Sequence, residues 1–422
     1  MFSVPLAREI PMVAGAEDAA ALHSPVGLPM DGRGRTPLHS VFMPIIRRRT
    51  FLKSAATPAV GLVLTAGLRG QAQQAERVSL AGDGLSLSPL EYARLLTRIA
   101  GSDGFHRDTY LHGGPVEELE RRFAAALGKE SALFLPTGTL ANHLAVRVLA
   151  GERRRVLVQA ESHFYRDEGD CGQLLSGLNL VPLGPGRATL RLDEVTQAVA
   201  QAAGPPYPAP VGVIAIESPV RRTKGQAFDF DEMKRVCAYA RTQQIGTHLD
   251  GARMFLASAY TGVSPAQYAA EFDTVYVSLY KYFNAPFGAI LAGSRQVVDR
   301  VTTLRHQFGS LVYQGWETAA VALHYLEGFA ERYAAAVRQG ETLLRLLEAD
   351  TRFRVERVKG GSNVFGFALA SGGTLDALRE RLAQAGIVLG GAKGATEGTL
   401  QINETISRRP PEEIARAFGV RP

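Results

Sequence analysis

One lysine occupies a position where a solvated charge is unusual. Lys281 follows a mostly apolar run at residues 274–279 and precedes Tyr282 and Phe283. The run is typical of a buried strand, so Lys281 would leave the sheet at a strand end among aromatic side chains. Burial lowers the pKa of a lysine and makes its amine a competent Schiff-base nucleophile. One lysine at a strand end would be unremarkable alone, so a covalent role for Lys281 depends on the features that precede it in the chain.

A carboxylate ends another predicted strand. Asp250 follows residues 246–249 and precedes Gly251, Ala252 and Arg253. A buried aspartate costs free energy unless a cation pairs with it. A protonated pyridine nitrogen is such a cation, and its protonation lets the ring act as an electron sink. A structural ion pair between Asp250 and Arg253 is the alternative interpretation.

Two further turns carry polar groups that could bind a cofactor. In residues 134–142, a strand ends in Thr137, Gly138 and Thr139, and a helix follows. Free backbone N–H groups and the helix dipole make such a turn an anion site, with ordinary helix capping by threonine as the alternative. His163 follows the predicted strand at 156–159; its imidazole could lie flat on a planar ring or be purely structural.

Several catalytic motifs are absent. The chain has no G-x-G-x-x-G after its first strand, no phosphate-binding G-x-x-x-x-G-K-[ST], no H-E-x-x-H and no G-x-S-x-G. Nucleotide-binding loops, zinc peptidases and serine hydrolases therefore lose their usual sequence support. Cys171 and Cys237 are too few for a disulfide scaffold or a zinc site, and we expect no metal.

The ordered set of features resembles the threonine aldolase and β-eliminating lyase family of fold type I pyridoxal-phosphate enzymes. The run His-Leu-Asp-Gly-Ala-Arg at 248–253 is the most specific match. It is supported by Pro-Thr-Gly-Thr-Leu-Ala-Asn at 136–142, by His163 with Glu168-Gly169, and by Lys281 with Ala285-Pro286-x-Gly288. The resemblance covers residues 113–294 and, more weakly, the C-terminal part.

The resemblance implies pyridoxal 5′-phosphate as cofactor and a role for each polar residue. Lys281 would form the internal aldimine, Asp250 would pair with the pyridine nitrogen, and His163 would stack on the ring and take part in proton transfer. The phosphate would be held by Thr137, Gly138 and Thr139. Arg253 would lie beside the phenolic oxygen of the ring or beside the substrate. Members of the family share active sites between subunits, so a homodimer or homotetramer is expected.

Three departures from the family pattern concern the substrate. No counterpart of the family's early Arg-Ser-Asp-Thr segment is evident before Gly113. Tyr313 stands where the family has an arginine, and Gln401 stands near the position of the arginine that binds the substrate carboxylate. Losing a bidentate arginine weakens carboxylate binding unless another cation replaces it. Candidates for that cation, each also interpretable as a surface charge, are Arg221, Arg222, Lys224 and Arg305.

The resemblance implies a lyase that acts on a small amino acid. The leading hypothesis is retro-aldol cleavage of a threonine-like β-hydroxy-α-amino acid to glycine and an aldehyde. β-Elimination uses the same cofactor and lysine but needs Cα–H abstraction and a β leaving group. A cofactor-binding protein without turnover is the third hypothesis, motivated by the missing arginines.

Strand-like and helix-like segments alternate from residue 111 onward, which predicts an α/β domain with a mainly parallel sheet. A smaller α+β unit follows a long predicted helix at 316–347. We therefore expect an N-terminal tail at 1–75, a large cofactor-binding domain within 76–315 and a C-terminal domain at 316–422. The other helices are expected at 115–127, 140–149, 192–203, 230–242, 265–270, 375–385 and 411–418. Further strands are expected at 131–135, 211–216, 289–292, 353–358, 364–369, 387–389 and 400–403.

The chain of 422 residues has a formal net charge of +6, most of which lies in its N-terminal tail. Residues 1–75 contain eight Lys or Arg and four Asp or Glu, a net of +4. The remainder has no basic block longer than Arg153-Arg154-Arg155. Because most of the excess charge lies in the tail, we expect no nucleic-acid partner.

The tail has the features of an export signal. Arg47-Arg48-Arg49-Thr50-Phe51-Leu52-Lys53 resembles a twin-arginine signal, and the mildly apolar run at 54–67 is too short to span a membrane. Gly70-Gln71-Ala72 fits a signal-peptidase site, with cleavage after Ala72. The alternative is a tail without a targeting role. We expect a periplasmic protein without a membrane span, the alternative being cytoplasmic, and translation from Met43 rather than Met1.

Overall fold

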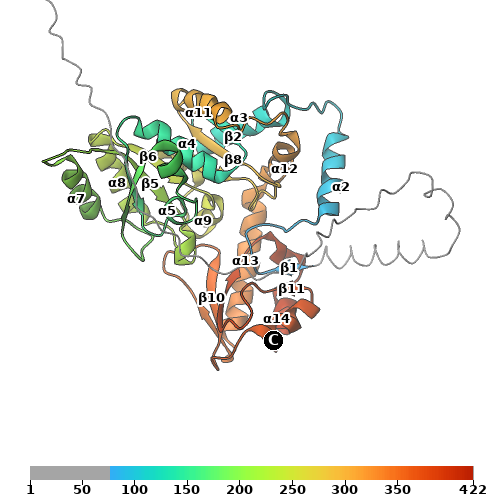
Figure 1. Ribbon diagram of the computed structural model, residues 1–422. Coiled ribbons are helices and arrows are strands. Elements are labelled where there is room, and N and C mark those ends of the chain that lie inside the picture. Colours follow the sequence, from blue (N-terminus) through green and yellow to red (C-terminus); the bar gives the residue numbers. More distant parts are fainter. Residues whose placement is uncertain (1–76, 422) are drawn as a thin grey trace, which may run out of the picture. The chain divides into compact units, whose positions relative to one another are not determined.

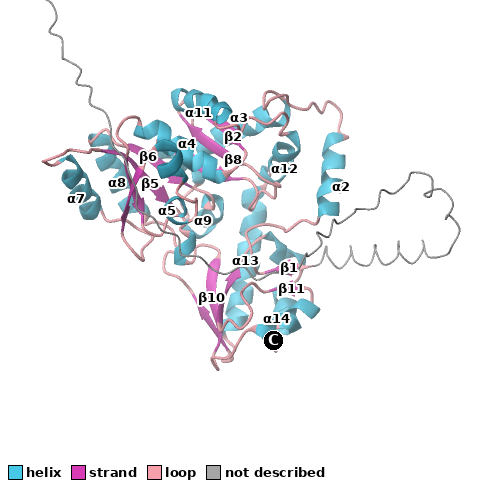
Figure 2. Ribbon diagram, viewed as in Figure 1, coloured by secondary structure: helices cyan, strands magenta, loops and turns pink. Residues whose placement is uncertain are grey.

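The computed structural model describes residues 77–421. Its main feature is a seven-stranded sheet with the order β2-β8-β7-β6-β5-β3-β4 (Figures 1 and 2). Strands β4, β3, β5, β6 and β7 run parallel, whereas β8 is antiparallel to both of its neighbours, β7 and β2. The strands are β2 (Ser131–Leu135), β3 (Arg155–Gln159), β4 (Asn179–Leu183), β5 (Val211–Glu217), β6 (Gly246–Asp250), β7 (Thr274–Ser278) and β8 (Ala289–Gly293).

Helices cover both faces of this sheet, which explains its continuous apolar strands. In β2, Phe134 packs into the cluster that contains Phe123 of α3 (Gly114–Leu127). Leu133, which points to the opposite face, packs with Leu144 of α4 (Gly138–Ala150) and Val298 of α11 (Arg295–Gln307). The remaining elements of this part are α5 (His163–Arg166), α6 (Cys171–Ser176), α7 (Leu192–Ala203), η1 (Arg221–Thr223), α8 (Phe230–Thr242), α9 (Met254–Thr261) and α10 (Pro265–Ala270).

A smaller three-stranded antiparallel sheet forms the C-terminal part, with the order β12-β10-β9. Helix α13 (Phe329–Glu348) contacts α9 as well as β9 and α15 of this part (Figure 1). Near the start of the described chain, β1 (Val78–Ser79) pairs in parallel with β11 (Ile387–Val388). The remaining elements here are β9 (Phe353–Glu356), β10 (Val364–Leu369), α14 (Asp376–Gln384), β12 (Glu397–Gln401), η2 (Glu404–Arg408) and α15 (Pro411–Ala417).

The α/β fold class with a mainly parallel sheet and a small C-terminal sheet is confirmed. The long helix predicted at 316–347 is wrong in one respect, because it consists of α12 (Trp316–Leu326) and α13. Gly328 between them has a φ of 62°, a left-handed conformation that interrupts a right-handed helix. The prediction also omitted α2 (Pro89–Ala100), α11 and β4.

Some sequence predictions lie outside the described residues. The export signal, the cleavage site after Ala72 and the start at Met43 all belong to residues 1–76. Among residues 77–421, no helix combines the length and apolar character that crossing a membrane requires. Within the same residues, Cys171 and Cys237 are free thiols.

Candidate active site

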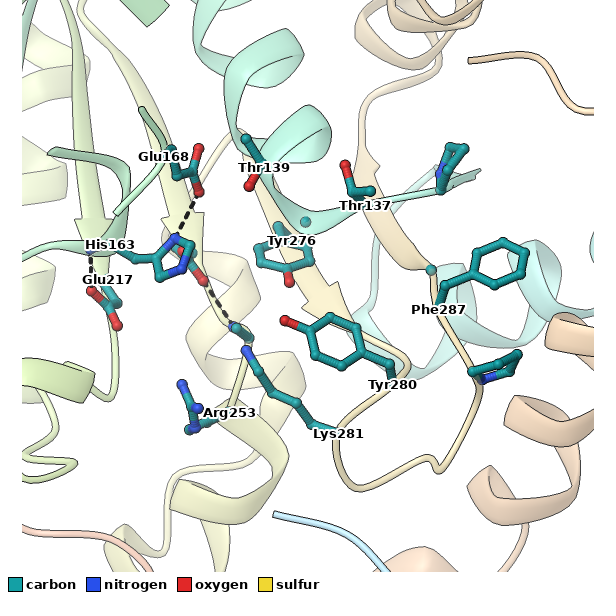
Figure 3. A pocket seen from close by; sticks show the side chains of 16 residues that line it. Thr137, Thr139, His163, Glu168, Glu217, Arg253, Tyr276, Tyr280, Lys281 and Phe287 are labelled. Carbon is teal, nitrogen blue, oxygen red and sulfur yellow. Dashed lines mark hydrogen bonds and ion pairs between the residues drawn. The ribbon is translucent and has the colours of Figure 1, made fainter. Parts of the chain in front are cut away.

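A cavity of about 340 Å³ lies where the carboxyl ends of several strands of the large sheet meet (Figure 3). Ligand sites of open α/β sheets commonly occupy this edge. The structure brings all seven residues singled out from the sequence into the lining of this one pocket: Thr137, Gly138, Thr139, His163, Asp250, Arg253 and Lys281.

The amino end of α4 supplies an anion site at one end of the pocket. Thr137 caps the helix, its hydroxyl accepting the N–H of Leu140 at 3.2 Å. The N–H groups of Gly138 and Thr139 have no acceptor within residues 77–421, as expected for a first helical turn. A Cβ at position 138 would overlap the hydroxyl of Tyr276, so only glycine lets this turn approach the sheet so closely.

Asp250 ends β6 and is held by a buried network on the side of the sheet covered by α4. Its Oδ2 accepts the Asn142 amide at 2.9 Å, and its Oδ1 accepts the N–H of Ala252 at 3.1 Å. Burial lowers the pKa of His248 to about 4, so its ring is neutral and donates from Nε2 to Asn142 Oδ1 at 2.9 Å. That bond fixes the orientation of the Asn142 amide. Within the described chain, Asp250 forms no ion pair, and Arg253 pairs elsewhere, so the alternative Asp250–Arg253 pair is not formed.

His163 follows β3 and presents one ring nitrogen to the pocket. Its Nδ1 lies 2.8 Å from Glu168 Oε1, and Glu168 also accepts the Asn142 amide at 2.8 Å. The hydrogen bond to buried Glu168 raises the pKa of His163. Nε2 of His163 has no hydrogen-bond partner within residues 77–421. The ring can therefore hold or transfer a proton at Nε2.

Glu217 ends β5 and was missed in the sequence analysis, although it carries the same feature as Asp250, a carboxylate at a strand end. Its Oε2 accepts the N–H of His163 at 2.7 Å, and its backbone N–H donates to Gln159 Oε1 at 2.7 Å. Burial, assisted by the nearby charge of Asp250, raises the pKa of Glu217 to about 7. Glu217 thus fixes the backbone from which His163 extends.

Lys281 follows β7 by way of Leu279 and Tyr280, and its side chain points into the pocket (Figure 3). Burial and the positive charge of Arg253 lower the pKa of Lys281 to about 8. About a tenth of the amine is therefore unprotonated at pH 7, far more than at the ordinary lysine pKa, and the unprotonated form is the nucleophile. The lysine lines the same pocket as the amino end of α4 and Asp250.

Arg253 lines both this pocket and an adjoining cavity of about 650 Å³. The second cavity is also lined by Asp83, Gly84, Ser86 and Leu87, which belong to a segment without helix or strand at residues 80–87 that we call the strap. Asp83 of the strap accepts Arg253 Nε at 2.8 Å. No counterpart of the family's early Arg-Ser-Asp-Thr segment was evident before Gly113 in the sequence, yet Asp83 does contribute to this side of the site.

The other candidate cations lie elsewhere. Arg221 and Arg222 both pair with Asp167, and Lys224 pairs with Glu356; all five side chains are at least partly exposed to solvent. Arg305 is buried and donates to the carbonyl of Phe134 at 2.8 Å. Of these four side chains, none lines the pocket. Gln401, which stands near the position of the family's carboxylate-binding arginine, accepts the N–H of Gly82 and so lies beside the strap.

Three of the pocket side chains lie close enough to ligate a cation. Ligand atoms of His163, Glu168 and Asp250 fall within 4.8 Å of one another. The amide of Asn142 already donates to both carboxylates, and Glu168 also bonds His163. The two carboxylates are thus already hydrogen-bonded to protein groups.

Known proteins resemble the chain in sequence and in structure. The beta-eliminating lyase family matches residues 105–369. A low specificity L-threonine aldolase of Saccharomyces cerevisiae is 31% identical over 207 residues, covering 49% of this chain and 53% of the yeast protein. An alanine racemase of Cochliobolus carbonum is 27% identical over 271 residues, 64% of this chain and 67% of that protein. The matched region thus spans little more than half of the yeast relative.

Solved structures match a larger share of the chain than these sequence relatives do. A proposed L-allo-threonine aldolase of Listeria monocytogenes has a TM-score of 0.69 and 25% identity, covering 83% of this chain and 97% of that protein. A threonine aldolase of Leishmania major has the same fold, with a TM-score of 0.63 at 18% identity and coverage of 81% and 98%. With the family match over more than half of the chain, the protein belongs to the beta-eliminating lyase family of pyridoxal-phosphate enzymes.

Proposed function

We propose that the protein binds pyridoxal 5′-phosphate in the described pocket and cleaves a threonine-like β-hydroxy-α-amino acid to glycine and an aldehyde. The observation that carries this proposal is that Lys281, a lysine of lowered pKa, lines one pocket together with a helix amino end and the buried carboxylate of Asp250. The similarity to threonine aldolases supports the choice of substrate class.

The donor set of the pocket fits this cofactor. The free N–H groups of Gly138 and Thr139, with the threonine hydroxyls, would hold the phosphate. Asp250 lacks a cationic partner within residues 77–421 and would pair with the protonated pyridine nitrogen. Lys281 would bond covalently to the cofactor aldehyde, and the ring of His163 would lie against the cofactor plane.

In the proposed cleavage, the Cα–Cβ bond breaks, the β-hydroxyl loses its proton to form the aldehyde, and Cα gains a proton to form glycine. When bound, pyridoxal phosphate withdraws electrons from Cα and weakens the bonds to that carbon. Asp250 keeps negative charge beside the ring nitrogen, which favours this withdrawal. His163 can accept or deliver a proton at Nε2, because Glu168 holds its Nδ1 at 2.8 Å.

Two measurements test the proposal. Purified protein mixed with pyridoxal phosphate should develop visible absorbance that Lys281→Ala abolishes. A panel of β-hydroxy and β-substituted amino acids should then yield glycine and aldehyde. Ammonia and a keto acid would instead identify β-elimination, and colour without any product would identify a cofactor-binding protein without turnover. A protein that stays colourless would overturn cofactor binding itself.

We also propose export through residues 47–72. The paired arginines Arg48 and Arg49, the short apolar run and the small residues before Gln73 support it. Changing Arg48 and Arg49 to Lys should trap the precursor in the cytoplasm, whereas unaffected export would exclude a twin-arginine route. Intact mass of the precursor would show whether translation starts at Met43 or Met1.

We further propose that the protein is a homodimer or homotetramer. Tyr110 and Tyr313 support it: they are 52% and 55% exposed, and their rings lie 5.2 Å apart in an edge-to-face pair. Exposed aromatic pairs of this kind are common at subunit contacts. Light scattering of purified protein should give a multiple of the chain mass, and a monomer mass would exclude both assemblies.

A further inference from the structure

We propose that Asp83 is a positioning residue that fixes Arg253 for the α-carboxylate of the substrate. The proposal rests on the proposed amino-acid function and assigns the carboxylate to Arg253, held in place by the strap, rather than to a C-terminal arginine. It starts from the contact between two segments that lie 170 residues apart in the chain.

The contact leaves the outer edge of the guanidinium available. Asp83 accepts only Arg253 Nε, at 2.8 Å, and neither Nη nitrogen has a hydrogen-bond acceptor within residues 77–421. A guanidinium can bind a carboxylate bidentately through its two Nη groups. The side chain of Arg253 is only 17% exposed, and Figure 3 shows it beside Lys281. Its free N–H groups therefore lie where an amino acid held at the lysine would place a carboxylate.

Asp83 itself is held on both sides. The carbonyl of Gly82 accepts the Asn403 amide at 2.9 Å, and the N–H of Gly82 donates to Gln401. On the other side, the N–H of Leu85 donates to Asn284 Oδ1 at 2.7 Å. Gly84 lies so close to the turn after β7 that a Cβ there would overlap the carbonyl of Lys281. The strap is therefore locked against the turn that carries the lysine.

These contacts give Gln401 a different task from the arginine expected there. Its side-chain oxygen accepts the Gly82 N–H and so stabilises the strap next to Asp83. Arg253 is the only arginine in the lining of the two cavities as the described residues form them. Because Asp83 compensates part of its charge, the orientation of Arg253 matters more than the amount of positive charge in the site.

The experiment compares two ligands on the cofactor-loaded protein by absorbance titration. Glycine has a carboxylate, and 2-aminoethanol has a neutral hydroxymethyl group in its place. In Asp83→Ala, glycine should bind about tenfold more weakly, which corresponds to about 1.4 kcal/mol, while 2-aminoethanol binding should change less than about twofold. Asp83→Asn, which keeps an acceptor oxygen for Arg253 Nε, should restore most of the glycine affinity.

Three controls make the outcome decisive. Arg253→Ala should lose at least as much glycine affinity, and adding Asp83→Ala to it should cause no further loss. Asp350→Ala removes another aspartate paired with an arginine, Arg352 at 2.6 Å, and should change neither ligand. Equal weakening of both ligands in Asp83→Ala, or no weakening of glycine, would overturn the positioning role. Because the readout is binding, it stands apart from whether the enzyme performs aldol cleavage, which only the product panel decides.

Discussion

On one side of the pocket, Asp250 lies at the end of β6 and bonds Asn142 of α4. His163, at the start of α5 just after β3, bonds Glu168 in the turn between α5 and α6. We call this the sheet side. On the other side, the strap side, Arg253 depends on Asp83, which the chain brings from far away in sequence. The sheet side would hold the cofactor, and the strap side would select the substrate. Changes on the strap side can therefore alter specificity without altering the cofactor chemistry.

The largest expected effect comes from Lys281, which lies between the two sides. Lys281→Ala should lower turnover by roughly a thousandfold or more for every substrate, because no other pocket residue offers a nucleophilic amine. The exposed lysine of the Lys224–Glu356 pair provides the control, and Lys224→Ala should retain full activity. Substantial turnover by Lys281→Ala would show that neither side of the pocket works as proposed.

The pH dependence of cofactor capture sharpens the same prediction. With a folded-state pKa of about 8, Lys281 is mostly an ammonium ion below pH 8 and mostly a free amine above it. The rate at which wild-type apoprotein gains visible absorbance should therefore rise with pH and level off above about pH 8. A rate that keeps rising towards the ordinary lysine pKa would mean that burial does not activate this amine.

Asp250 tests the sheet side alone. Asp250→Asn keeps an oxygen for the Asn142 amide but removes the charge that would keep a pyridine nitrogen protonated. Turnover should fall by about 10²–10³-fold, equally for all substrates. Asp231→Asn, at an exposed pair with Lys234, should have no effect. A loss confined to certain substrates would contradict the division into a cofactor side and a substrate side.

The sheet side was predictable because each of its motifs is contiguous. Thr137, His163 and Asp250 each follow a recognisable strand, and the carboxyl ends of parallel strands meet at one edge of a sheet. Glu217 carries the same local pattern and could have been found by it. Asp83 could not, since its only evidence is a pairing with a residue 170 positions away. The helix α2 was missed despite its capping box at Ser88 and Glu91.

The candidate partners of the substrate carboxylate show the same limit of sequence-based prediction. Arg221 and Arg222 were candidates from the sequence, yet both pair with Asp167. Arg305 is buried against the backbone of β2 instead of lining the pocket. Whether an arginine is free depends on its neighbours in space, which a single sequence does not contain.

Glu168 should control how kcat depends on pH, because it sets the pKa of His163 on the sheet side. The hydrogen bond from Glu168 raises the pKa of His163, so the wild-type ring keeps its proton to higher pH than an ordinary histidine. Glu168→Gln should lower that pKa and move the His163-dependent limb of the kcat profile to lower pH, with about tenfold lower activity near neutrality. Ring NMR of His163 measures the shift directly. Glu118→Gln, on the surface of α3, should leave the profile unchanged, and an unmoved limb in Glu168→Gln would remove His163 from proton transfer.

Thr137 should give the smallest effect and separates helix capping from phosphate binding. Thr137→Ala removes the cap of α4, in which the hydroxyl accepts the Leu140 N–H, and should cost about 1 kcal/mol of unfolding free energy. Ser294 caps α11 in the same way, accepting the N–H of Val297, but lies outside the lining of the pocket. Ser294→Ala should therefore cost a similar amount in denaturant unfolding and leave cofactor affinity unchanged, whereas Thr137→Ala should also weaken pyridoxal-phosphate binding severalfold. Equal cofactor affinity in the two variants would reduce Thr137 to a cap and leave the phosphate to the backbone N–H groups and Thr139.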